Sequence, residues 1–440
     1  MFRILSARSS LLVVGIPRIP SQSFQIRTMG SISAFDSIIF RNLFGTDEIR
    51  SIFSDQAYVK RCVDVETGLA RAQAHCNVIP AEAAKEITAL SNTGGLDFDR
   101  LRNETDIVGY PILPLDIMDT ASVLQIKDGL AVVEGKLDSV ISALERLSLA
   151  HRDTPMAGRT HLQHALPVTF GYKCAVWLSG LQRHKERLRQ LVPRALVVQY
   201  GGAAGTLASL GPGEDGLNVR RQLAKEMGLA DPPITWHVAR DGIAEVTNLL
   251  ALIGGTLGKV ALDLIFMSSN ELERLPSPSS PTVVPLQPCH KREIPSRVSM
   301  VADFERASGP WHLEWVAIPE SFVMAVGALH QAEFVLAGLE VSKTQMAANL
   351  ALSKGLIVGE AVMMSLANHM GRQNAHDVVY KACKETIELG GDVTLLQTLK
   401  KDQRVLDTVS TEELESLCDP MNYMGSSQRM VDSILSLQNE

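Results

Sequence analysis

The chain has 440 residues, of which 45% are hydrophobic, and its mean hydropathy is close to zero. This length allows two or three domains with a sizeable core, and the composition excludes a fibrous or disordered protein. The net charge of −7 and the lack of a long basic run argue against a nucleic-acid surface, whereas a small anionic substrate requires only a local basic pocket.

Residues 1–30 have the composition of a mitochondrial transit peptide. They carry Arg3, Arg8, Arg18 and Arg27 but no acidic residue, and their apolar run at 11–16 is too short to cross a bilayer. We therefore expect the protein in the mitochondrial matrix. The alternatives are a disordered tail, or translation that starts at Met29, which would leave the protein in the cytoplasm.

Apolar residues recur at three- and four-residue spacing over most of the remaining chain, which predicts helices. An amphipathic helical pair is expected at 47–78, and a turn at 105–119 contains Pro111 and Pro114, with Asp119 as the N-cap of the next helix. Strand patterns are nearly absent, so the sequence predicts an all-α fold with a bundle of long helices. The long helices are expected at 120–151, 170–199, 243–270 and 316–339.

The segment 158–173 concentrates side chains that can carry chemistry. His161 and His164 occur there with Arg159, Thr160 and Gln163, between two long helical stretches. Reactive groups often lie on loops that helices hold in place. A histidine-rich turn is, however, more often a helix cap or a surface cluster, so this segment alone does not identify a site.

Two further segments can contribute to an anion site. Residues 200–211 are rich in glycine and could present backbone N–H groups to an anion, with close helix packing as the alternative. No strand precedes them and no GK[ST] follows, which argues against a nucleotide fold. Residues 236–241 place His237, Arg240 and Asp241 just before a helix begins. The six cysteines show no CxxC pair or zinc spacing, and we expect reduced thiols, no metal and no cofactor.

Segments 158–171, 201–211, 303–320 and 352–364 together resemble the fumarase/aspartase superfamily. The nearest branch is that of 3-carboxy-cis,cis-muconate cycloisomerase, adenylosuccinate lyase and trans-aconitate decarboxylase, and the resemblance covers about residues 40–435. It implies a homotetramer whose active sites draw on several subunits. It also implies three all-α domains, an N-terminal one at 31–119, a central long-helix bundle at 120–345 and a C-terminal one at 346–440.

The resemblance further implies the reaction. A serine on a mobile loop removes a proton next to a carboxylate, and the aci-carboxylate intermediate then expels a β substituent. His161 would donate a proton or orient the substrate, with Arg159, Thr160 and Gln163 beside it. Arg240 and Lys291 would bind substrate carboxylates.

The chain departs from the family pattern at two substrate-binding segments. After residues 110–115 the family continues through a helix and a His-Trp-Gly-Ala-Thr-Thr-Gln-like loop, whereas here Asp116 follows directly. The serine loop is replaced by a proline-rich stretch, which by composition is a flexible linker. A one-nucleotide frame shift there, with suitable codons, yields Arg-Gly-Ser-Ser-Ser-Thr-Met-Pro-Gln-Lys-Arg-Asn-Pro.

We hypothesise that residues 273–295 are an out-of-frame translation of the serine loop, because Ser279 and Ser280 stand among prolines and are poor bases. The sequence thus supports a lyase or cycloisomerase acting on a small di- or tricarboxylate, most like the muconate cycloisomerase. A decarboxylase-like or adenylosuccinate-lyase-like enzyme, a catalytically impaired relative and a metabolite-binding module are the alternatives.

Overall fold

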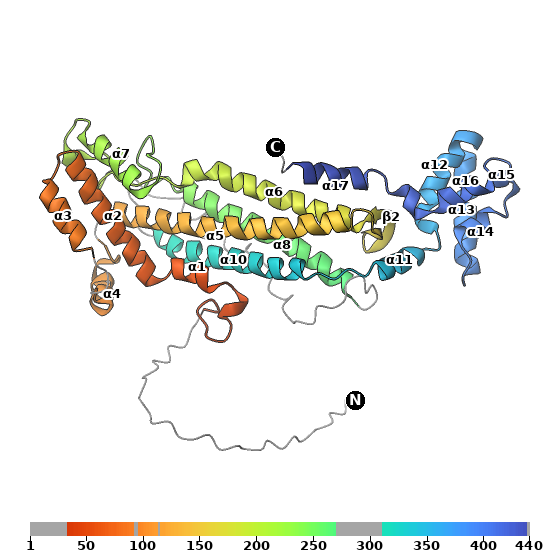
Figure 1. The fold of residues 1–440 in the computed structure, drawn as a ribbon, viewed down its shortest axis with the longest axis horizontal. Helices are drawn as coiled ribbons and strands as arrows, with labels where there is room; N and C mark the ends of the chain where they lie inside the picture. Colours follow the sequence, from red (N-terminus) through yellow and green to blue (C-terminus); the bar gives the residue numbers. More distant parts are fainter. Residues whose placement is uncertain (1–32, 92–95, 113–114, 270–309, 438–440) are drawn as a thin grey trace, which may run out of the picture.

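A computed structural model describes residues 33–91, 96–112, 115–269 and 310–437 and shows an elongated, mostly helical molecule (Figure 1). The expected transit peptide at 1–30, Lys291 and the proline-rich residues 273–295 lie outside the described residues. At one end of the molecule lie α2 (Asp55–His75), α3 (Ala81–Ala89), α4 (Phe98–Val108) and α7 (Asp215–Met227), while the short α1 (Asp47–Ile52) lies beside the long helices.

Long helices form the central bundle and confirm the helical periodicity. They are α5 (Leu115–Ala150), α6 (Phe170–Ala195), α8 (Asp241–Met267) and α10 (Glu314–Ala337). The 36 residues of α5 give it a length of about 54 Å, since each helical residue rises 1.5 Å. Because α6 runs antiparallel to α5, the chain returns along the bundle before it enters α7 and α8 (Figure 1).

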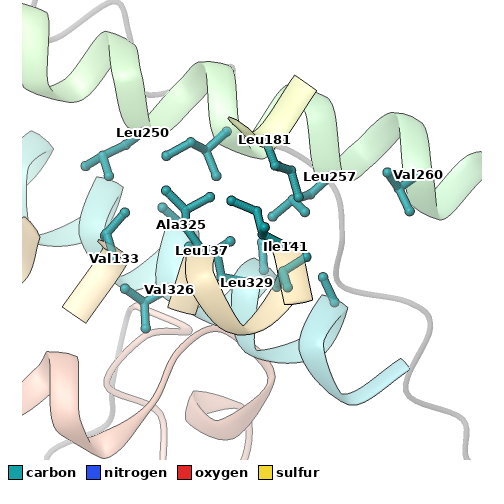
Figure 2. Close-up of a cluster of buried hydrophobic side chains, with 14 of the residues drawn as sticks. Val133, Leu137, Ile141, Leu181, Leu250, Leu257, Val260, Ala325, Val326 and Leu329 are labelled. Carbon is teal, nitrogen blue, oxygen red and sulfur yellow. The ribbon is translucent and has the colours of Figure 1, made fainter. Parts of the chain in front are cut away.

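The bundle core follows from the spacing of apolar side chains. Val133, Leu137 and Ile141 recur at intervals of four along α5 and face Leu257 of α8 and Leu329 of α10 (Figure 2). Each of these side chains is at least 96% buried. Burial of one such side chain contributes about 1.5–3 kcal/mol, so this contact surface holds α5, α8 and α10 together.

One turn expectation is wrong. The turn was expected to reach residue 119 with Asp119 as an N-cap, but α5 already begins at Leu115 and Asp119 lies within its first turns. The carboxylate of Asp119 accepts a hydrogen bond from Arg240, which is distant in sequence, instead of capping the helix. The boundary between the first two predicted domains, at residue 120, therefore falls inside α5; the three-domain division itself stays a prediction.

Strands are rare in the described residues, as expected, but the histidine-rich segment is more than a turn, because it contains a small two-stranded sheet. Residues within the histidine-rich segment form an antiparallel hairpin of β1 (Pro155–Thr160) and β2 (Gln163–Thr169), with a register shift between Ala157 and Arg159. Thr169 then caps α6, because its side-chain oxygen accepts a hydrogen bond from the backbone N–H of Tyr172 at 3.0 Å. The hairpin lies where α5 ends and α6 begins (Figure 1).

A group of short helices follows the bundle at the hairpin end (Figure 1). Their own apolar cluster includes Val362, Leu366 and Leu414, and α17 returns to pack against α6. They are α11 (Lys343–Ala351), α12 (Gly359–Met370), α13 (Arg372–Leu389), α14 (Leu395–Leu399), α15 (Gln403–Leu406), α16 (Thr411–Cys418) and α17 (Ser427–Ser436).

By length and composition α8 could cross a membrane, as could the bent pair formed by α11 and residues 356–370. Half of the apolar stretch of α8 is buried within the protein, however, as in the core helix of a helical bundle.

Candidate active site

The tip of the hairpin presents His161 to solvent. His161 and Leu162 have φ angles of 48° and 65°, and Thr160 pairs with Gln163 on either side of them. Two consecutive residues with positive φ form the type I′ turn that suits a tight hairpin. The side chains of Thr160, His161 and Gln163 are all exposed, so the structure brings these predicted site residues together.

Arg159 stabilises this turn from within. Its Nη1 donates to the backbone oxygen of Leu162 at 2.8 Å, and its Nη2 lies 2.9 Å from Nε2 of His164. Because the guanidinium can only donate, Nε2 of His164 is the acceptor. Partial burial lowers the pKa of Arg159 from its usual value. The hydrogen bonds of Arg159 therefore fix the orientation in which the hairpin presents His161.

A lysine pair lies near the base of the hairpin, between α6 and α8. Lys173 Nζ is 3.1 Å from Asp263 Oδ2, which also accepts from Lys259. The two ammonium groups lie over the Trp177 ring, 5.7 and 5.8 Å from its centroid. Burial and the charge of Lys173 lower the pKa of Lys259 to about 8. The pair gives this end of the bundle a local positive charge that sequence spacing did not reveal.

The opposite end of the bundle holds a buried ion cluster around Arg240. Its Nε donates to Glu314 at 2.9 Å, its Nη2 donates to Asp119 at 3.0 Å, and a second contact joins it to Glu314. Trp311 Nε1 also donates to Asp119, at 3.2 Å. The Trp236 ring lies 5.1 Å from the guanidinium carbon. We call Asp119, Arg240 and Glu314 the buried triad.

The electrostatics of the buried triad keep Arg240 charged. Burial alone would lower the pKa of Arg240, but the charges of Asp119 and Glu314 outweigh burial and raise that pKa. The helices α5, α8 and α10 all begin at this end, and Glu314 lies in the first turn of α10, where the helix N-terminus favours a carboxylate. Most of the Arg240 guanidinium is thus bound by protein carboxylates, although its Nη1 is buried without a hydrogen-bond partner.

A second network, around Asp116, shapes the glycine-rich loop. Asp116 Oδ2 accepts from the backbone N–H groups of Gly201 and Gly202 at 2.9 and 2.7 Å. Gln199 links this carboxylate to His237, because its Nε2 lies 3.4 Å from Asp116 Oδ1 and 3.1 Å from His237 Nδ1. The loop N–H groups therefore bind a protein carboxylate instead of facing outward to an anion.

Comparisons with known proteins agree with this architecture. The chain matches the family model described as Lyase over residues 114–281 and the one described as Adenylosuccinate lyase C-terminus over residues 355–434. It is 38% identical to trans-aconitate decarboxylase 1 of Mycosarcoma maydis, over 90% of this chain and 88% of that protein. It is 35% identical to 3-carboxy-cis,cis-muconate cycloisomerase of Pseudomonas aeruginosa, over 90% and 96%.

Solved structures show the same fold. The fumarate lyase of Mesorhizobium sp. BNC1 matches with a TM-score of 0.85 and 48% identity, over 89% of this chain and 98% of that one. The β-carboxy-cis,cis-muconate cycloisomerase of Acinetobacter calcoaceticus sp. ADP1 matches with a TM-score of 0.86 and 34% identity, over 91% and 100%. The chain belongs to the fumarase/aspartase superfamily. It is therefore an enzyme of the lyase type by family, with the all-α bundle expected from its sequence.

The chain lacks segments that a relative in the fumarase/aspartase superfamily has. The alignment with the Pseudomonas aeruginosa cycloisomerase extends over 447 positions, more than the 440 residues of this chain. That relative therefore carries positions without a counterpart here, and the deletion expected before Asp116 stays a prediction. The serine-loop hypothesis for residues 273–295, and with it the role of Lys291, lies outside the described residues.

The predicted site residues lie in two groups at opposite ends of the bundle. His161 lies beyond the C-terminal end of α5, whereas Arg240 contacts Asp119 near the N-terminal end, so about 45 Å of helix lies between them. The sequence identified Arg240 but not its partners Asp119 and Glu314, nor Gln199. Within the described residues, no group of three or more His, Cys, Asp or Glu side chains could hold a metal ion.

Proposed function

We propose that the protein is a lyase or cycloisomerase that acts on a small di- or tricarboxylate through an aci-carboxylate carbanion, most like 3-carboxy-cis,cis-muconate cycloisomerase. The observation that carries this proposal is the hairpin of this chain, a member of the superfamily. The exposed tip of the hairpin holds His161, with Thr160 and Gln163 beside it. A proton donor at an exposed tip can enter a site formed by a neighbouring chain.

The proposed chemistry assigns a role to each group. His161 donates a proton to the substrate or orients it, and the hydrogen bonds of Arg159 hold the turn in place. A proton next to a carboxylate is weakly acidic, so cationic groups must stabilise the dianionic intermediate. Arg240, through its unpartnered Nη1, and Lys291 bind substrate carboxylates.

A homotetramer is part of the proposal. Because His161 and Arg240 are about 45 Å apart along one bundle, a single chain cannot place both on one small substrate. Association of several bundles, with the hairpin end of one beside the triad end of another, would place both groups in one site.

A trans-aconitate decarboxylase-like reaction is the second candidate. Identity to the Mycosarcoma maydis decarboxylase, 38%, is higher than identity to the Pseudomonas aeruginosa cycloisomerase, 35%. The match of residues 355–434 to the adenylosuccinate lyase C-terminus leaves C–N cleavage as a further variant. All of these reactions share the carbanion, and the leaving group differs.

The test supplies the purified chain with 3-carboxymuconate, trans-aconitate and adenylosuccinate and follows ultraviolet absorbance. Turnover of one substrate that is abolished in His161→Ala and retained in His376→Ala supports the proposal; His376 is exposed on α13, outside the hairpin. No turnover of any of them by a folded chain would instead favour a catalytically impaired relative. In that case sequencing of the transcript across residues 110–120 and 270–305 decides whether segments are missing from the gene.

We also propose that residues 1–30 direct the protein to the mitochondrial matrix, given their arginine content and lack of acidic residues. A fusion of these residues to a fluorescent protein tests this, and a cytoplasmic signal would contradict it.

A further inference from the structure

The second histidine of interest, His237, has one ring nitrogen that makes no hydrogen bond. Its Nδ1 lies 3.1 Å from Gln199 Nε2, while its Nε2 is buried without any hydrogen-bond partner. Buried polar atoms in folded proteins nearly always find a partner, so an unpartnered ring nitrogen calls for an explanation.

The surrounding hydrogen bonds fix which nitrogen of His237 carries the proton. The side-chain oxygen of Gln199 accepts from the backbone N–H of Trp236 at 2.9 Å. Its NH₂ group must then face both Asp116 and His237, because a carboxylate can only accept. Gln199 therefore donates to His237 Nδ1. A neutral His237 ring consequently carries its proton on Nε2, and this unpartnered atom is a hydrogen-bond donor.

The His237 ring lies against the glycine-rich loop at Gly205, which has no side chain. A methyl group on Gly205 would lie 2.8 Å from His237 Cε1 and 2.7 Å from Thr235 Oγ1. Gly205 has a φ of 80°, in the left-handed region that glycine adopts without strain. The bare backbone at Gly205 thus leaves room for the ring edge that carries Cε1 and, next to it, Nε2.

A second unpartnered donor belongs to the same turn of the chain. Arg240 Nη1 is buried without a hydrogen-bond partner, although the rest of the guanidinium is bound by Asp119 and Glu314. The backbone folds the two residues together, since the N–H of Ala239 donates to the oxygen of Trp236 at 2.8 Å. Two donors without partners therefore belong to one turn of the chain at the start of α8, where the helix N-terminus adds positive potential, and a carboxylate has two oxygens that can accept from such donors.

We propose that His237, as the neutral Nε2–H tautomer, donates a hydrogen bond to a carboxylate oxygen of the substrate beside Arg240. The inference rests on the proposed function, because it deepens the description of the same polycarboxylate site. In this role His237 is a binding residue that transfers no proton. Its orientation depends on Gln199, which is in turn held by Asp116 and by the backbone of Trp236.

The test measures binding, so it does not depend on turnover. Isothermal titration with trans-aconitate compares the wild-type chain with His237→Ala, His237→Gln and the distant control His376→Ala. Loss of the donor in His237→Ala should weaken binding by about tenfold or more, the usual effect of removing a hydrogen bond to a charged group. His237→Gln can place an amide N–H near the Nε2 position and should stay within about threefold of the wild type.

Nitrogen NMR of the histidine rings gives a second readout. The free protein should show His237 with the proton on Nε2, and trans-aconitate should shift that N–H signal. The inference would be overturned if His237→Ala bound trans-aconitate as tightly as the wild type, or if His237→Gln bound it as weakly as His237→Ala. It would also be overturned if NMR placed the proton on Nδ1, or if an ordered water remained hydrogen-bonded to Nε2 in the ligand-bound protein. A chain that binds trans-aconitate in this way but converts no substrate would sink the proposed function and leave the inference standing.

Discussion

At the scale of single residues, the buried triad combines two carboxylates with one guanidinium. Arg240 and Glu314 are 4% and 2% exposed, so neither can be hydrated if its partner is lost. Removal of the one cation leaves two buried carboxylates uncompensated, whereas removal of one carboxylate leaves a neutral pair. Loss of Arg240 should therefore destabilise the protein more than loss of either carboxylate of the buried triad.

We expect Arg240→Met to lower the free energy of unfolding by about 3–5 kcal/mol, the usual cost of breaking a buried ion pair, and Glu314→Gln to lower it by clearly less. Urea denaturation monitored by circular dichroism measures both. Arg100→Met is the matched control, since Arg100 pairs with Glu104 on the exposed surface of α4 and should have no measurable effect. Equal losses from Arg240→Met and Glu314→Gln would contradict this charge count.

At the scale of elements, a buried histidine joins α6 to α8 and makes their packing sensitive to pH. His184 Nε2 lies 2.8 Å from Thr256 Oγ1, and the side chain is 5% exposed. Burial, together with the charges of Arg187 and Arg183, lowers the pKa of His184 from 6.5 to about 4. His184 is therefore protonated below about pH 6.5 in the unfolded chain but only below about pH 4 in the folded chain.

Stability linked to His184 is therefore complete above pH 6.5 and falls as the pH decreases toward 4. The loss amounts to about 3 kcal/mol. Urea denaturation between pH 4 and 7 should show a shallower decline in His184→Gln than in the wild type, because glutamine does not titrate. Since carboxyl groups titrate in the same range, the difference between the two proteins is the relevant quantity, and parallel curves would refute the assignment.

The hairpin turn carries strain that a single substitution can remove. Leu162 has a φ of 65° and its side chain is 66% exposed, so it adopts a left-handed conformation with little burial in return. Glycine adopts this conformation freely, and we expect Leu162→Gly to raise the free energy of unfolding by about 1 kcal/mol. Leu166→Gly, within β2, is the control and should be destabilising. A lower melting temperature in Leu162→Gly would count against strain in the turn.

The long helices could be predicted from the sequence, whereas the hairpin and the partners of Arg240 could not. The long helices follow from local periodicity, as in the row Val133, Leu137 and Ile141, and were predicted to within a few residues. The hairpin was missed because β2 lacks alternation and contains Pro167, while its turn depends on positive φ at residues that seldom adopt it. The partners of Arg240 were missed because Asp119 is distant in sequence, and no local pattern encodes that contact.

At the scale of the whole molecule, the two ends of the bundle carry complementary parts of the proposed site. The hairpin with His161 lies at one end, and the buried triad with His237 lies at the other, about 45 Å away along α5. Between them, α8 exposes large apolar side chains: Leu252, Leu262, Ile265 and Phe266, each about half exposed. Several large apolar side chains exposed along one helix are more than a soluble surface needs and are typical of subunit interfaces.

We predict that this face of α8 joins the bundles of the proposed homotetramer. Leu262→Asp combined with Phe266→Asp should then separate the chains, because buried unpaired carboxylates are unfavourable at such an interface. Analytical ultracentrifugation should show a mass below that of four chains. Catalytic activity should disappear as well, although His161 and Arg240 are both intact, since a single chain holds these two residues about 45 Å apart and cannot bring both to one substrate. Leu389→Asp, at a similarly exposed leucine on α13, is the control and should keep both mass and activity. A double variant that dissociates yet remains active would mean that one chain suffices for catalysis.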